Sequence, residues 1–342
     1  MMMSTSQFLL KQLHQRSQRS SKSDGFTLIE LLVAMVIAVI IITPIMGFMV
    51  SLMNTDKQEQ AKATSEQELQ TAIDFITQDL QQAVYIYDND GLSRNSSNNL
   101  QQSGIRNQIP SSNAGFGCPT GATCTPVLVF WKRQFLDRDV QITKAGGGRD
   151  SVGNIMAQNN VRGVKGDTYV YSLVGYSLVE GGGTNTPWSN VARIARFEIR
   201  DGILQEDGKT YAAPPEAGFK PFDLSIATDL ENVMNQWQSD TATRANFDVG
   251  DVLIDYITKS GQGVPSPVTC DTNGTVNTKQ RITAGNDAFV ACVNVEQGTA
   301  RVYVRGNALA RIQPDSKYRN ARASFFPLVS TQVDGRGFLF SK

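Results

Sequence analysis

An uncharged stretch near the N-terminus constrains this chain more than any other feature of its sequence. The 23 residues from Leu31 to Met53 carry no charge and are mostly Leu, Ile, Val, Met and Ala. In a helix, about 20 such residues cross the hydrocarbon core of a bilayer, which is about 30 Å thick. A buried core helix rarely stays apolar on all its faces for so long. The stretch therefore predicts one membrane-spanning helix, and the sequence contains no second stretch of this kind.

Outside this stretch the 342-residue chain has the composition of an ordinary globular protein. Hydrophobic residues make up 40% of the chain and charged residues 19%, which does not suit a disordered chain. Lys plus Arg and Asp plus Glu each number 32, so the net charge is zero. This balance gives no support for electrostatic binding of nucleic acid.

The segment before the uncharged stretch is basic, which predicts its side of the membrane. Positive charge next to a span keeps that end in the cytoplasm, so the rest of the chain is expected outside. A secretory signal would have a shorter apolar core followed by a small-residue cleavage site, and no such site follows here. The charged residues of this segment are Lys11, Arg16, Arg19 and Lys22 against Asp24.

The hexapeptide G-F-T-L-I-E, residues 25–30, resembles the processing motif of type IV pilins and pseudopilins. The resemblance implies that a membrane-embedded prepilin peptidase cuts after Gly25 and that Phe26 becomes the N-methylated terminus. Residues 1–25 would then be a cleaved leader. The resemblance also gives Glu30 a reason to stand in a membrane helix, where a charge costs about 2.5–3.5 kcal/mol at mid-bilayer. It implies that Glu30 faces the terminal amine of a neighbouring subunit. The alternative is a carboxylate that reaches the membrane interface without a partner.

The helix is expected to continue beyond the membrane. Residues 54–68 are polar, and the following apolar residues recur at spacings of three and four, the pattern of one buried helix face. We predict one helix from residue 26 to about residue 86, with a transmembrane half (26–53) and an amphipathic half (54–87) that docks on the outer domain. The apolar face consists of Leu69, Ala72, Ile73, Ile76, Leu80, Ala83 and Val84.

Residues 88–342 are predicted to form an extracytoplasmic, β-rich globular domain. Short runs of β-branched and aromatic residues, several with period-two alternation, predict strands between Gly-rich joints. One short helix is expected between residues 223 and 238. The fold class is therefore α+β and pilin-like, with one long helix packed on a mostly antiparallel sheet. The predicted strands are 126–133, 168–180, 191–200, 251–257, 288–296 and 300–312.

All four cysteines lie in the predicted outer domain, which fits an oxidising compartment. Four cysteines allow three connectivities. We expect local pairing, Cys118 with Cys124 and Cys270 with Cys292, and the alternative is free or mispaired thiols. The spacings do not match a zinc site.

The sequence offers little catalytic chemistry. Its single histidine, His14, lies in the predicted leader, which disfavours histidine-dependent catalysis and histidine metal centres in the mature chain. We therefore predict no enzyme, no cofactor and no metal. Two segments resemble the start of calcium loops, 88–91 (D-N-D-G) and the one with Asp271 and Asn273. Neither has a Glu at the twelfth loop position, so solvated turns are preferred.

The size of the outer domain suggests a low-copy subunit. Its 255 residues correspond to a radius of gyration of about 18 Å, whereas packed helices lie about 10 Å apart, so repetition at every filament position would crowd the shaft. The segments T-A-I-D-F-I-T-Q-D-L-Q-Q-A-V and R-I-A-R-F-E-I-R resemble J-type minor pseudopilins and large minor pilins. Residues 25–91, followed by V-L-V-F-W-K-R-Q, resemble pseudopilins of the cyanobacterial hormogonium polysaccharide secretion system.

These resemblances imply a minor pseudopilin of a type IV pilus-like or type II secretion-like filament that supports polysaccharide secretion and gliding motility. They imply a single-pass inner-membrane protein with its outer domain in the periplasm or outside the cell. The implied partners are other pseudopilins, the prepilin peptidase and the inner-membrane assembly platform, with polysaccharide as a further candidate. The alternatives are a tip adhesin or glycan-binding minor pilin that uses Trp188 or Tyr176, and a J-like pseudopilin of protein secretion. A membrane-tethered enzyme is disfavoured by the missing histidine.

Overall fold

The computed structural model describes residues 25–342 except 159–166, 183–186, 227–228, 268–269, 271–277, 284, 286, 315 and 336–342. The leader with His14, and the turn with Asp271 and Asn273, therefore lie outside the described residues. The chain divides into two compact units, residues 1–56 and residues 57–342.

Helix α2 (Leu28–Leu80) has 53 residues and contributes to both units. Its part in the first unit is apolar on every side, and all described side chains from residue 25 to residue 60 are exposed. Among the described residues α2 is the one helix long and apolar enough to cross a membrane. A core helix would bury such a surface within the chain, so exposure on all faces favours a membrane span.

The second unit is built on two antiparallel sheets that share one hydrophobic core. The larger sheet has the strand order β1-β2-β5-β6-β9 and the smaller one β10-β11-β12-β13, and two further hairpins pair β3 with β4 and β7 with β8. The strands are β1 (Ala83–Ile86), β2 (Ala122–Leu136), β3 (Gln141–Thr143), β4 (Arg149–Ser151), β5 (Thr168–Gly181), β6 (Ala192–Arg200), β7 (Ile203–Leu204), β8 (Tyr211–Ala213), β9 (Asp251–Ile257), β10 (Arg281–Thr283), β11 (Phe289–Asn294), β12 (Thr299–Arg305) and β13 (Leu328–Asp334). The short helices are α3 (Asn89–Ser93), α4 (Val152–Gln158) and α5 (Leu230–Asn235).

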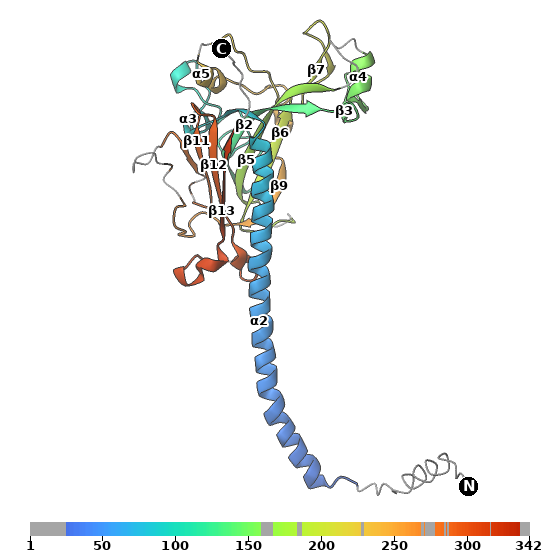
Figure 1. The fold of residues 1–342 in the computed structure, drawn as a ribbon, viewed down its shortest axis with the longest axis vertical. Coiled ribbons are helices and arrows are strands. Elements are labelled where there is room, and N and C mark those ends of the chain that lie inside the picture. Colours follow the sequence, from blue (N-terminus) through green and yellow to red (C-terminus); the bar gives the residue numbers. More distant parts are fainter. Residues whose placement is uncertain are drawn as a thin grey trace, which may run out of the picture. The chain divides into compact units, whose positions relative to one another are not determined.

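The C-terminal half of α2 packs along these sheets, as the predicted apolar face requires (Figure 1). Leu69, Ile73 and Ile76 are almost fully buried in the common core. The backbone after β12 comes so close to the helix that a Cβ at Gly306 would lie 2.8 Å from Leu69 Cδ1. Only glycine fits this approach without displacing Leu69. The predicted pilin-like α+β architecture is confirmed.

The opposite face of the larger sheet is covered by the segment that contains α5. Successive side chains of a strand point to opposite faces, and Lys132 of β2 reaches α2, so its neighbour Trp131 faces away from the helix. Trp131 makes edge contacts with Phe219 and Trp237. Its indole N–H donates to the Tyr87 hydroxyl at 3.0 Å. The larger sheet is therefore the middle layer of this unit.

The helix is shorter than the sequence predicts. It ends at Leu80, and Ala83 and Val84, expected on its apolar face, belong to β1. There Tyr85 pairs with Trp131 of β2. The run A-V-Y-I has β-branched and aromatic residues that suit a sheet, and pairing with β2 overrides the helical spacing. In the same way, the strand predicted over 300–312 ends at Arg305 and is followed by a short 3-10 helix.

A group of charged and polar side chains, here called the Asp79 cluster, holds α2 on the sheet. Asp79 is buried, and its Oδ1 lies 3.1 Å from Lys132 Nζ of β2. Its Oδ2 accepts hydrogen bonds from Tyr176 of β5 at 2.6 Å and from Arg196 of β6 at 2.7 Å. Glu198 of β6 pairs with both cations, at 3.0 and 2.6 Å. One helix carboxylate therefore engages three strands, and Tyr176, considered above as a glycan ligand, is buried beneath the helix.

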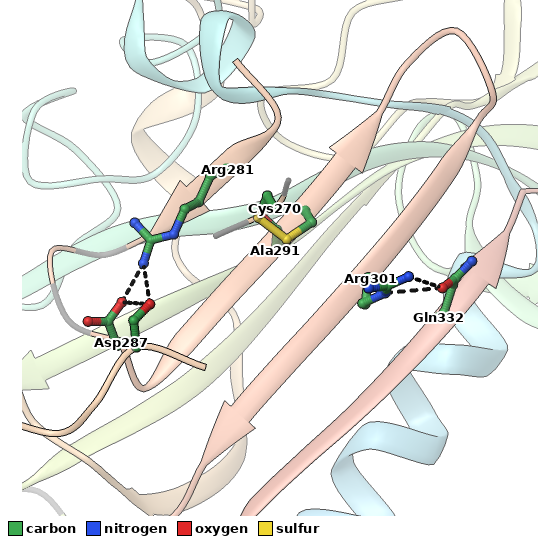
Figure 2. Close-up of a disulfide and its surroundings, with 8 residues drawn as sticks. Cys270, Arg281, Asp287, Ala291, Arg301 and Gln332 are labelled. Atoms are coloured by element: carbon green, nitrogen blue, oxygen red, sulfur yellow. Dashed lines mark hydrogen bonds and ion pairs between the residues drawn. A yellow bond between two sulfur atoms is a disulfide. The ribbon is translucent and has the colours of Figure 1, made fainter. Parts of the chain in front are cut away.

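Both disulfides that the sequence led us to expect are present, Cys118–Cys124 and Cys270–Cys292. The first closes a turn at the start of β2. The second joins the segment before β10 to β11 (Figure 2). Close to it, Arg281 pairs with Asp287, and across β12 and β13 Arg301 donates to the side-chain oxygen of Gln332. These contacts connect neighbouring strands of the smaller sheet and the segment before it.

We predict that Asp79→Ala destabilises the second unit by about 3 kcal/mol, the lower end of the range for breaking a buried ion pair, because Glu198 still neutralises part of the charge. Denaturant unfolding of the full-length protein in detergent measures this change. The matched control is Asp74→Ala, an exposed carboxylate on the same helix. Equal destabilisation by the two substitutions would contradict the prediction.

The same cluster predicts a pH dependence. Burial alone would raise the pKa of Asp79, but the Arg196 hydrogen bond and the Lys132 charge outweigh burial and hold this pKa below its usual value of 3.8. A carboxyl group with a lowered pKa contributes stability that is complete above its unfolded-state pKa and is lost as the pH falls through the folded-state value. Below about pH 4 the wild-type protein should therefore lose stability more steeply than Asp79→Asn. Parallel acid unfolding curves for the two proteins would contradict this.

The two disulfides should differ in their contribution to stability. Their sequence separations of 6 and 22 residues correspond to about 2.2 and about 3.4 kcal/mol of lost chain entropy in the unfolded state. The double variant Cys270→Ala/Cys292→Ala should therefore unfold more easily than Cys118→Ala/Cys124→Ala. Peptide mapping without reductant checks the pairing itself, and free thiols in the wild-type protein would refute it.

Candidate processing and assembly site

The hexapeptide 25–30 spans the start of α2. Gly25, Phe26 and Thr27 are not helical, and the helix begins at Leu28. The Thr27 carbonyl accepts hydrogen bonds from the N–H groups of Glu30 and Leu31, both at 3.1 Å. The Thr27 hydroxyl lies 3.3 Å from the Glu30 N–H. A Thr followed three residues later by Glu is the sequence pattern of a helix N-cap, so this pair defines where the helix starts.

Glu30 therefore has a local role within a single chain. It stands in the first turn of α2, where the exposed N–H groups and the helix dipole favour a negative charge. Its side chain is exposed, and the structure shows no ion pair of Glu30 with any other described residue. The partner implied by the resemblance belongs to another subunit, so that pairing stays a prediction.

Gly25 occupies open space. A Cβ built on this residue would have no heavy atom within 4 Å, and its backbone is not in the left-handed region that favours glycine. Nothing in the described part of the fold requires glycine here. A requirement for glycine must then come from whatever binds the segment.

The peptide bond between Gly25 and Phe26 is accessible. It lies outside the helix, and Phe26 is 75% exposed. Exposed, non-helical segments are where proteolysis concentrates, because their backbone is free of regular hydrogen bonds. The geometry therefore suits cleavage at the predicted position, directly before the apolar helix.

A second group of polar side chains, here called the Asp88 cluster, lies in the second unit. Carboxylate oxygens of Asp88, Asp90 and Glu231 all lie within 4.8 Å of one another. Asp88 is the N-cap residue of α3, Asp90 lies in the first turn of α3, and Glu231 comes from α5. Burial raises the pKa of Asp88 above its usual value, and the charge of Glu231 adds to this effect. The D-N-D-G segment stands out in the sequence, but the contribution of Glu231 does not, because nothing in the sequence relates residues so far apart.

Comparison with known proteins identifies the N-terminal region. Residues 20–46 match the family model described as the prokaryotic N-terminal methylation motif. No curated protein and no solved structure matches the chain. The matched segment includes Gly25, Phe26 and Glu30 and ends within the apolar part of α2. The chain therefore carries the N-terminal methylation motif of type IV pilins and pseudopilins on a pilin-like α+β fold.

Proposed function

We propose that this chain is a minor pseudopilin, a low-copy structural subunit of a type IV pilus-like or type II secretion-like filament. Prepilin peptidase cuts it between Gly25 and Phe26 and methylates the Phe26 amine. The observation that carries the proposal is the accessible, non-helical Gly25–Phe26 bond directly before a helix that is apolar on all sides, within a segment that matches the methylation motif.

The apolar half of α2 supports assembly as well as anchoring. Its exposed Leu, Ile, Val and Met side chains can be covered either by lipid or by the same half of neighbouring subunits. Among packed helices, away from water, a carboxylate and an ammonium attract each other with little screening. Glu30 lies one turn from the amine that cleavage creates, so equivalent groups on adjacent subunits can set their axial register.

The size of the outer domain supports a low copy number. A domain with a radius of gyration of about 18 Å cannot repeat at the close spacing of helices in a shaft without crowding. We therefore place the subunit at low copy in an inner-membrane filament system, with other pseudopilins, the peptidase and the assembly platform as partners. The resemblance of residues 25–91 to hormogonium pseudopilins supports polysaccharide as the exported cargo and gliding motility as the process served.

A groove in the second unit favours glycan binding as a second candidate function. The groove has a volume of about 510 Å³ and lies between α2 and β9. Its aromatic residues Phe75 and Trp188 are 43% and 41% exposed, and Gln67 and Thr71 add polar groups. If this candidate is correct, Trp188→Ala should abolish binding of the secreted polysaccharide while filament incorporation stays normal. Unchanged binding would remove this candidate.

The proposed cleavage is tested by intact-mass measurement of the protein extracted from membranes. Removal of 25 of the 342 residues leaves 317, starting with N-methyl-Phe. Gly25→Val should leave the leader attached without changing the helix, since the structure has room for the larger side chain at this position. Ser20→Val in the leader is the control and should be processed normally. A wild-type protein that still begins at Met1 would refute the pseudopilin proposal.

The proposed assembly role of Glu30 is tested by crosslinking to other pseudopilins in membranes, together with a secretion assay. Glu30→Gln and Glu30→Ala should be inserted and cleaved, but both should lose crosslinks and export, because neither offers a charge to the neighbouring amine. Thr27→Val is the matched control, since it removes the helix cap and keeps the charge. Normal crosslinking of both Glu30 variants, or an equal defect in Thr27→Val, would show that Glu30 acts only within its own helix.

A further inference from the structure

The Asp88 cluster has the dimensions of a calcium site. Ca²⁺ binds oxygen ligands at about 2.3–2.6 Å, so two ligands on opposite sides of the ion lie about 5 Å apart. The carboxylate oxygens of Asp88, Asp90 and Glu231 lie within 4.8 Å of one another. Asp88 and Asp90 are spaced like the first two ligands of a calcium loop. The carboxylate that the sequence lacks at the twelfth position is supplied by Glu231 of α5.

A second observation also points to a ligand. Asp88 is only 1% exposed, and its Oδ1 accepts a hydrogen bond from the Gly91 N–H at 3.0 Å. Its Oδ2 has no hydrogen-bond partner among the described residues, and neither does the hydroxyl of Tyr85, which is 4% exposed. Buried polar atoms without partners are costly, and a cation bound by Asp88 would satisfy its Oδ2.

The cluster already attracts a cation from the chain itself. Lys279 Nζ lies 2.9 Å from Glu231 Oε1 and 3.7 Å from Asp88 Oδ2. The Lys279 backbone carbonyl accepts a hydrogen bond from the Asn89 N–H at 2.9 Å, which holds this lysine beside the start of α3. Its side chain is 50% exposed, so the ammonium group can move into solvent. Arg94 occupies one oxygen of Asp90, at 2.9 Å, and leaves the other oxygen for a ligand.

We propose that Asp88, Asp90 and Glu231 form a calcium site in which the Lys279 ammonium takes the place of the ion when calcium is absent. The three carboxylates supply the protein ligands, and water completes the shell on the exposed side. Mg²⁺ fits less well, because it requires shorter bonds and near-ideal octahedral geometry. Bound calcium would tie the start of α3 to α5, two segments that are distant in the sequence. The site is independent of the proposed filament function.

The test is calorimetric titration of the full-length protein in detergent with CaCl₂, together with thermal unfolding in CaCl₂ and in EDTA. Wild-type protein should bind one Ca²⁺ with a dissociation constant of about 10⁻⁴–10⁻³ M, the range of extracellular calcium modules, and should unfold at a higher temperature with calcium. Glu231→Gln and Asp90→Asn should each weaken binding by about tenfold or more. The control, Asp207→Asn, changes an exposed carboxylate outside the cluster and should bind like wild type.

Lys279→Met separates a calcium site from a plain salt bridge. Removal of the competing ammonium should tighten calcium binding by about tenfold, even though it also removes an ion pair from the calcium-free protein. A cluster that serves only as a salt bridge would lose stability in Lys279→Met and bind no calcium in either protein. The proposal is overturned if neither wild type nor Lys279→Met shows saturable binding, or if Glu231→Gln binds calcium as wild type does. Lys279→Met keeps all three ligands, so it tests the site even if the ligand variants fail to fold.

Discussion

The buried carboxylate of Asp79 fixes how the long helix meets the sheet. It accepts from Tyr176 and Arg196 and pairs with Lys132, which come from β5, β6 and β2. A shift of the helix by one residue would turn Asp79 away from all three partners and would leave the buried Lys132 and the partly buried Arg196 with Glu198 alone, which is a large cost. Apolar packing alone distinguishes the registers less sharply, since Leu and Ile side chains replace one another with modest cost. The ionic contacts therefore select one register from those that the apolar face allows.

The two halves of α2 differ in how their apolar side chains are covered. The half in the second unit buries Leu69, Ile73 and Ile76 in the core of the same chain, so its requirement for apolar contact is satisfied. The half in the first unit has no buried residue, and its apolar surface must be covered by molecules outside the chain. A single helix thus joins a segment whose apolar face is buried within its own chain to a segment whose apolar surface requires lipid or other subunits. This division matches the position of the methylation motif, because all of the matched residues 20–46 belong to the first unit.

Periodicity and local motifs predicted much of this structure. The span, the buried face around Leu69 and the central strands all carry local signals. The features that were not predicted correctly depend on contacts between residues far apart in the sequence. Residues 83–86 have helical spacing, but their pairing with β2 decides their conformation. Strand β13 was not predicted, because its alternation of polar and apolar residues is weak. The partners of Asp79 and the role of Glu231 depend on strands and helices far apart in the chain, so local sequence patterns could not predict them.

Under the proposed function, processing and assembly are linked by charge. Before cleavage, the nitrogen of Phe26 is part of a neutral amide, and Glu30 in a neighbouring membrane helix would find no positive partner there. Cleavage converts this nitrogen into an amine, which is protonated near neutral pH and remains basic after methylation. The favourable pair therefore exists only between mature subunits, while an unprocessed chain would have to bury an unpaired carboxylate at a cost of several kcal/mol. The same bond cleavage that removes the leader thus creates the group that Glu30 requires, so the order of events follows from electrostatics.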